Sequence, residues 1–192
     1  MKKIFFLLPF LLLFFPPLTE ARPAKNRTIG LLGIGNIQLL NSIPQLDPGP
    51  GGGAYFDYRF NQRFSITLDA WATTQNGNGP SSGEGDIELL GIPTFTIKLY
   101  LSNDESSRFD PFAGIGIGAY ALTEGSISNG TSGVGLGAHI DVGFDYHFND
   151  LITAGFSGIF RSTALITNLN SSGNNALAMI PFSLVTRVGF HF

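Results

Sequence analysis

Apolar and polar residues alternate with a period of two along most of the chain. The C-terminal run is the clearest case: one face carries Ile180, Phe182, Leu184, Thr186, Val188, Phe190 and Phe192, and the other carries Pro181, Ser183, Val185, Arg187, Gly189 and His191. Successive side chains of a strand point to opposite faces, whereas a helix would spread both sets around its circumference. The run therefore predicts a β-strand with one apolar face and one small or polar face.

The same alternation recurs upstream, in residues 56–61, 63–70, 94–101, 133–148 and 152–161. Two further segments, 28–36 and 109–122, are rich in glycine, and the phase of the first is ambiguous. In the second, we expect Gly114, Gly116 and Gly118 to face a crowded interior, opposite Ile115 and Ile117. The pattern as a whole predicts an all-β fold, an eight-stranded antiparallel up-and-down transmembrane β-barrel.

The connections between these segments alternate in length. Short polar connections follow the second, fourth and sixth strands, at residues 61–62, 102–108 and 149–150, and longer ones rich in Gly, Ser, Asn and Pro follow the others, at 37–52, 75–85, 123–132 and 166–176. Short periplasmic turns and long outer loops are typical of outer-membrane barrels. A secreted β-sandwich or a lipocalin-like barrel would also alternate, but it has no reason to sort its connections in this way.

The N-terminus has the layout of a secretory signal peptide. Lys2 and Lys3 precede an apolar run over residues 4–15, and the small-residue site Thr19-Glu20-Ala21 follows. An N-terminal membrane helix is the alternative, but the run is shorter than the ~20 residues that such a helix needs, and prolines interrupt it. We therefore expect a signal peptide at 1–21, a short segment at 22–27 and the barrel at 28–192, exported to the bacterial outer membrane.

Composition narrows the classes of partner and cofactor. Charged residues make up 13% of the chain, which contains 25 Gly, 18 Phe and no Cys, so disulfides and thiolate metal sites are excluded. Without residues 1–21, 9 basic and 13 acidic residues remain, a balance that argues against nucleic acid as a partner. His139 and His147 share a strand face but lie roughly 27 Å apart at strand rise, so they cannot hold one metal ion. No cofactor and no metal are expected.

An apolar face turned to lipid leaves the opposite set of side chains inside the barrel. Buried charges persist only when they are paired and hydrogen-bonded. We therefore predict an internal ion-pair network, either a plug or the lining of a narrow path, with these members: Asp57, Arg59, Arg63, Asp69, Lys98, His139, Asp141, Asp145, Arg161 and Arg187. Glu88 is a further candidate.

Three segments resemble eight-stranded outer-membrane barrels of the OmpA, OmpX and OmpW type. The first is the Gly-rich stretch PFAGIGIGAY at 111–120, the second is GFDYHFND at 143–150, and the third is the ending RVGFHF at 187–192. The resemblance covers most of the chain after the signal peptide. It implies that Phe190 and Phe192 form the C-terminal signal read by the barrel-assembly machinery, with periplasmic chaperones and outer-membrane lipid as the other partners and the oligomeric state open.

Two functions fit such a barrel. The first is a structural, envelope-integrity or surface-interaction role, and the second is an OmpW-like narrow conduit for small solutes, with hydrophobic solutes among the candidates. A lipid A-modifying enzyme is less favoured, because a serine nucleophile needs a base beside it. The candidate outer rim at 160–163 contains Arg161 and Ser162 but no histidine. Arg161 at that rim is also a candidate contact for anionic lipid head groups.

Overall fold

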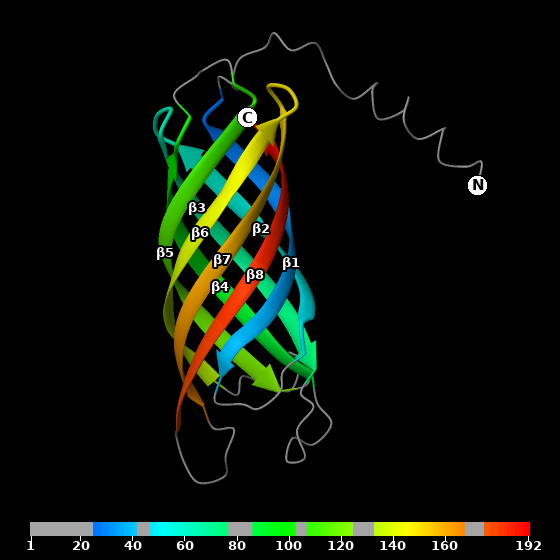
Figure 1. Ribbon diagram of the computed structural model, residues 1–192, viewed down its shortest axis with the longest axis vertical. Coiled ribbons are helices and arrows are strands. Elements are labelled where there is room, and N and C mark those ends of the chain that lie inside the picture. The colour runs from blue at the N-terminus through cyan, green and yellow to red at the C-terminus, as the bar shows by residue number, and fades with distance from the viewer. Residues whose placement is uncertain (1–24, 42–46, 77–85, 103–106, 125–132, 168–174) are drawn as a thin grey trace, which may run out of the picture.

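The computed structural model describes residues 25–41, 47–76, 86–102, 107–124, 133–167 and 175–192, and the expected signal peptide at 1–21 lies outside them. Eight antiparallel strands form a closed barrel (Figure 1). Their bounds are β1 Arg27–Asn41, β2 Gly49–Arg59, β3 Phe64–Asn76, β4 Asp86–Tyr100, β5 Phe109–Glu124, β6 Gly133–His147, β7 Ile152–Thr167 and β8 Asn175–His191. Among the described residues, no helix is long and apolar enough to cross a membrane.

Each strand pairs with its neighbours in sequence, and β1 closes the barrel against β8. This closing pair begins at Thr28, opposite His191, and ends at Asn41, opposite Met179, with a register shift between Gln38 and Leu40. Closure satisfies the backbone hydrogen bonds of both edge strands, which lipid could not do. The eight-stranded up-and-down barrel predicted from the alternation is thereby confirmed.

The apolar set of side chains faces outward. Ile115 and Leu136 are 67% and 72% exposed, whereas Lys98 and Arg187 are 2% and 5% exposed. The ambiguous phase of β1 is also resolved, since Thr28, Gly30, Ile34 and Asn36 point inward. The distribution of apolar and charged side chains is therefore the reverse of that in a soluble protein. The outer surface is apolar, and the ionic groups are enclosed.

The strands run further than the sequence predicted. The segment 37–41 belongs to β1, so the expected connection 37–52 shrinks to 42–48, and the other three long connections shrink to 77–85, 125–132 and 168–174. The reason is that neighbouring strands continue to satisfy the backbone through these small and polar residues. Strand β4 also begins at Asp86, well before the predicted residue 94.

The remaining connections, 60–63, 101–108 and 148–151, lie together at one end of the barrel, where β1 begins and β8 ends (Figure 1). We call this the turn end. The opposite end, where β1, β3, β5 and β7 end, is called the loop end, and the sequence segments 42–48, 77–85, 125–132 and 168–174 that follow these strands are called the loop-end connections.

Candidate functional site

The interior of the barrel is the candidate site, because the predicted charged residues converge there. Arg187 is one of them, with Nη2 3.7 Å from Asp141 Oδ2 and Nε 3.7 Å from Asp145 Oδ1. The Arg187 Nη2 group also donates to Ser157 Oγ at 2.7 Å, and Tyr100 donates its hydroxyl to Asp145 Oδ2 at 3.0 Å. One cation from β8 is thus held by two carboxylates from β6.

A second group of charges surrounds Asp57 on β2. Lys98 Nζ lies 3.6 Å from Asp57 Oδ1, and Lys98 also lies over the ring of Phe112, 4.8 Å from its centroid. Ser65 and Thr67 donate hydroxyl hydrogen bonds to Asp57 Oδ1 at 3.0 and 2.5 Å. The carboxylate is therefore satisfied by a cation and by two hydroxyls from β3.

Arg59 and Asp110 form the shortest ion pair among the described residues, near the turn end. Arg59 Nη2 lies 2.7 Å from Asp110 Oδ2, and the guanidinium stacks over Tyr100 at 3.8 Å from the ring centroid. His147 Nε2 lies 3.9 Å from the same carboxylate oxygen. The sequence analysis missed Asp110, although it stands in the inward phase of β5, two residues before Phe112.

Asp69, His139 and Arg161 lie deeper in the barrel. The hydroxyl of Thr94 donates to Asp69 Oδ1, and Thr96 Oγ1 is hydrogen-bonded to His139 Nε2 at 2.8 Å. Arg161 stands opposite His139 in the register and donates from Nη1 to Ser183 Oγ at 2.5 Å. These three residues share the interior with the ion pairs.

Polar contacts continue from Arg161 toward the loop end along β8, β1 and β3. Ser183 donates to Asn36 Oδ1 at 2.7 Å, and Asn36 Nδ2 donates to Gln75 Oε1 at 3.2 Å. Gln38 Nε2 donates to the same Gln75 oxygen at 2.9 Å. None of these amides was a candidate in the sequence analysis, because β1 had no assigned phase there and Gln75 was assigned to the connection 75–85.

Two sequence-based placements are wrong. Arg63 lies exposed in the turn between β2 and β3, where its backbone N–H bonds Asn61 Oδ1, because the inward phase of β3 begins only at Ser65. Residues 160–163 do not form an outer rim, because β7 continues to Thr167. As a result Arg161 is enclosed, out of reach of lipid head groups, and Ser162 faces outward.

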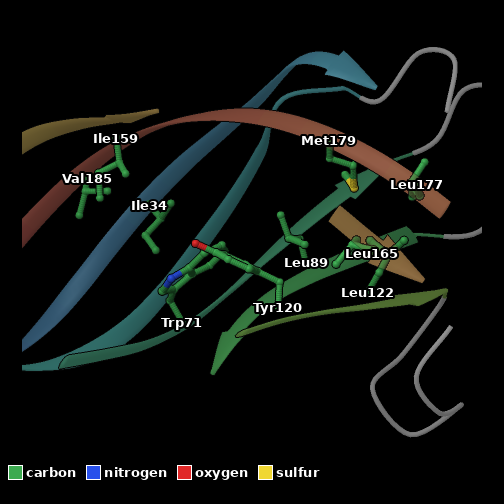
Figure 2. Close-up of a cluster of buried hydrophobic side chains, with 10 residues drawn as sticks. All are labelled: Ile34, Trp71, Leu89, Tyr120, Leu122, Ile159, Leu165, Leu177, Met179 and Val185. Atoms are coloured by element: carbon green, nitrogen blue, oxygen red, sulfur yellow. The ribbon is translucent and has the colours of Figure 1, made fainter. Parts of the chain in front are cut away.

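Near the loop end, apolar side chains fill much of the interior, which the sequence analysis did not predict (Figure 2). The cluster comprises Ile34, Trp71, Leu89, Tyr120, Leu122, Ile159, Leu165, Leu177, Met179 and Val185. Most of its loop-end members, such as Leu89 and Leu165, stand near strand ends that the sequence analysis left unassigned. Leu89, Leu122 and Met179 have no exposed area, so the cluster closes this part of the interior.

Glycines make room for the large interior rings. A Cβ added at Gly91 would come within 2.5 Å of the Trp71 indole nitrogen, and one added at Gly116 would come within 2.3 Å of His139 Nε2. The sequence analysis predicted that the glycines of β5 face a crowded interior, and these glycines do lie against interior side chains. Large rings and glycines alternate across neighbouring strands.

Little empty space remains in the interior. Two cavities of about 30 and 20 Å³ lie among the charged residues and share Tyr55, Lys98 and Arg187 in their walls. Each has room for only one or two water molecules.

A larger hollow of about 600 Å³ lies on the outer, lipid-facing surface over β4–β7 and is lined by residues such as Phe95, Ile117 and Ser162. Within the described ranges, no group of three or more His, Asp or Glu residues is arranged to hold a metal ion.

Comparison with known proteins agrees with this architecture. The family model described as outer membrane protein beta-barrel domain matches residues 5–177. The crystal structure of OprG from Pseudomonas aeruginosa is similar with a TM-score of 0.59 and 16% identity, covering 90% of this chain and 98% of OprG. Neisserial surface protein A is similar with a TM-score of 0.66 and 12% identity, covering 86% of this chain and 97% of that protein. No curated protein matches the chain significantly by sequence.

Proposed function

The chain belongs to the outer membrane β-barrel family, and from this premise we propose that it is a closed, structural barrel of the outer membrane whose loop end faces the outside. Its role is to anchor in the bilayer and to present the loop-end connections for envelope integrity or surface contact. The single observation that carries this proposal is the filled interior among the described residues, where the two cavities between the charged side chains measure about 30 and 20 Å³. A barrel of eight strands is just wide enough for side chains to fill it.

Two features of the interior argue against a conduit. The ion pairs of Arg187, Lys98 and Arg59 cross the turn-end part, and a path through it would have to break them. Beyond them, the apolar cluster with Leu89, Leu122 and Met179, which have no exposed area, occupies the interior toward the loop end. The interior network is therefore proposed to act as a plug that stabilises the barrel.

We propose no enzymatic role. Ser162, the candidate nucleophile, faces lipid from β7, whereas the nearby His139 points inward and bonds Thr96. A base on the opposite side of the barrel wall cannot remove a proton from the serine hydroxyl.

Export and assembly are proposed to follow the family's route. Residues 1–21 would direct secretion, and Phe190 and Phe192 would be read by the barrel-assembly machinery. The outward, exposed position of both phenylalanines at the end of β8 supports this reading, since the assembly machinery could reach them from the lipid side.

Planar-bilayer recording with the purified, refolded barrel tests the plug. Wild type should give no stable unitary conductance. Replacing Leu89, Leu122 and Met179 together by alanine should leave a barrel that still shows heat-modifiable mobility but conducts at times. Stable unitary events from wild type would favour the conduit instead and would overturn the proposal.

A further inference from the structure

Outward-facing aromatic residues gather at the turn end. They form what we call the aromatic belt, which consists of Tyr58, Phe60, Phe64, Phe109, Phe144, Tyr146, Phe148, Phe156, Phe190 and Phe192. Several of its rings touch, with centroids 5.0 Å apart for Tyr58 and Phe60 and 4.9 Å apart for Phe109 and Phe144. Aromatic rings concentrate at membrane–water interfaces, so the belt marks the level of one boundary of the bilayer.

The loop end has no matching belt among the described residues. Its outward positions carry small or aliphatic side chains, as at Leu39, Ala72, Ala121, Val134 and Ile166. Trp71 and Tyr120, which lie toward that end of the barrel, point inward and pack together at 6.1 Å between centroids. One boundary of the bilayer is therefore contacted by aromatic side chains and the other by small or aliphatic ones.

Exposed cations accompany the aromatic belt. Arg27 is exposed at the start of β1 and stands between two belt residues, since it pairs with Tyr58 on β2 and its carbonyl accepts a 2.9 Å hydrogen bond from the backbone of Phe192. Arg63 is exposed in the turn immediately before Phe64. Both guanidinium groups can lie beyond the rings on the water side while their carbon stems cover the belt.

The loop-end connections and the strand residues next to them contain no lysine or arginine. Residues 28–58, 64–97, 109–160 and 162–186, which contain all four loop-end connections, lack both residue types, and Asp47, Glu84, Asp86, Glu88 and Glu124 fall within or beside those connections. All basic residues outside the interior therefore belong to the turn end or to the segment before it. The exposed basic residues and the aromatic belt therefore lie at the same end of the barrel, the turn end.

We propose that Arg27 and Arg63 bind the phosphate groups of anionic glycerophospholipids in the leaflet around the turn end. This inference rests on the membrane insertion stated above but not on the closed interior. A guanidinium offers paired N–H donors that match two phosphate oxygens, and belt residues beside each arginine place it at head-group depth. Lipid is the occupant because Arg27 stands on the outward face of β1 and Arg63 is exposed immediately before the outward ring of Phe64, so both lie beside rings of the same interface.

Unfolding of the barrel in nanodiscs tests the proposal, with the fluorescence of Trp71 as the probe. Discs of phosphatidylcholine are compared with discs in which part of this lipid is replaced by phosphatidylglycerol. For wild type, the anionic lipid should raise the folded-to-unfolded ratio by about fivefold for each arginine, and the gain should fade in about 1 M salt, where charges are screened beyond roughly 3 Å. The Arg27→Gln/Arg63→Gln variant should lose the gain, and native mass spectrometry should find fewer phosphatidylglycerol molecules retained on it.

The Asp47→Asn variant is the matched control, because it removes an exposed charge at the loop end and should keep the full gain. No effect of phosphatidylglycerol on wild type, or an equal effect on wild type and the double arginine variant, would overturn the inference. Stable channel events in a planar bilayer would overturn the closed barrel but leave this lipid contact standing. The two failures are therefore distinguishable.

Discussion

The guanidinium of Arg161 lies over the indole of Trp71, 4.5 Å from the ring centroid. Trp71 belongs to the apolar cluster, while Arg161 Nη1 donates to Ser183 Oγ, so the pair joins the polar part of the interior to the apolar part. Arg161 is 3% exposed, and in this position its charge is stabilised by the face of the ring and by polar neighbours. The contact shows how one narrow interior holds ionic and apolar groups together.

Replacing Arg161 by alanine should destabilise the barrel by about 3 kcal/mol, because the hydrogen bond to Ser183 and the contact with the ring of Trp71 are lost together. Urea unfolding in lipid, followed by the fluorescence of Trp71, measures this change. The neighbouring Ser162→Ala variant is the control and should unfold like wild type, since its side chain faces lipid. Equal midpoints for the two variants would contradict the prediction.

Replacing Arg187 by methionine should cost about 3–5 kcal/mol, because Asp141 and Asp145 are then left buried without their cation. The Arg63→Met variant removes an exposed arginine and should stay within about 0.5 kcal/mol of wild type in a neutral lipid. Adding Asp145→Asn to Arg187→Met should recover part of the loss in the same unfolding experiment. A loss at Arg187 no larger than that at Arg63 would rule out a stabilising network.

Replacing Gly116 by valine should reduce the yield of folded barrel, because its Cβ would lie 2.2 Å from the Phe95 carbonyl oxygen and 2.3 Å from His139 Nε2. Gly35→Val is the matched control, since a Cβ at Gly35 meets no atom within 4 Å. The fraction of heat-modifiable protein after refolding measures both variants. The Gly35 variant should fold like wild type, and similar yields from the two would show that interior crowding does not constrain Gly116.

The Ser162→Ala variant should leave lipid A unchanged. Mass spectra of lipid A from cells that produce wild type, the variant or neither should coincide, because no base accompanies the serine on its face of the wall. A new lipid A species that is present with wild type and absent with Ser162→Ala would show that the protein is an enzyme. It would contradict the proposal of a purely structural barrel.

The sequence predicted the barrel because its strands expose opposite chemistry on their two faces. Residues 133–148 and 180–192 alternate strictly, and the structure has each of them in the predicted phase. The same phase placed Lys98, Asp141 and Arg187 inside. It did not reveal which carboxylate each cation contacts, because the partners stand on different strands and depend on register.

The apolar cluster was less predictable for a physical reason. A lipid-facing leucine and an interior leucine look alike in sequence, so Leu89, Leu165 and Leu177 carried no signal until the strand ends were known. Arg63 and Arg161 show the complementary error. Their depth depends on where a strand begins or ends, and the small and polar residues around those ends continue the ladder without a visible boundary.

Cysteine labelling at two adjacent positions tests the central claim, that apolar residues face lipid and polar residues are enclosed. The chain has no cysteine, so Thr96→Cys and Ile97→Cys each introduce a single thiol on β4, at positions 3% and 47% exposed. In bilayers, the Ile97→Cys variant should react with a membrane-soluble maleimide and not with a charged one, while the Thr96→Cys variant should react with neither until it is unfolded. Rapid reaction of the Thr96→Cys variant with the membrane-soluble reagent, or of the Ile97→Cys variant with the charged reagent alone, would contradict the account.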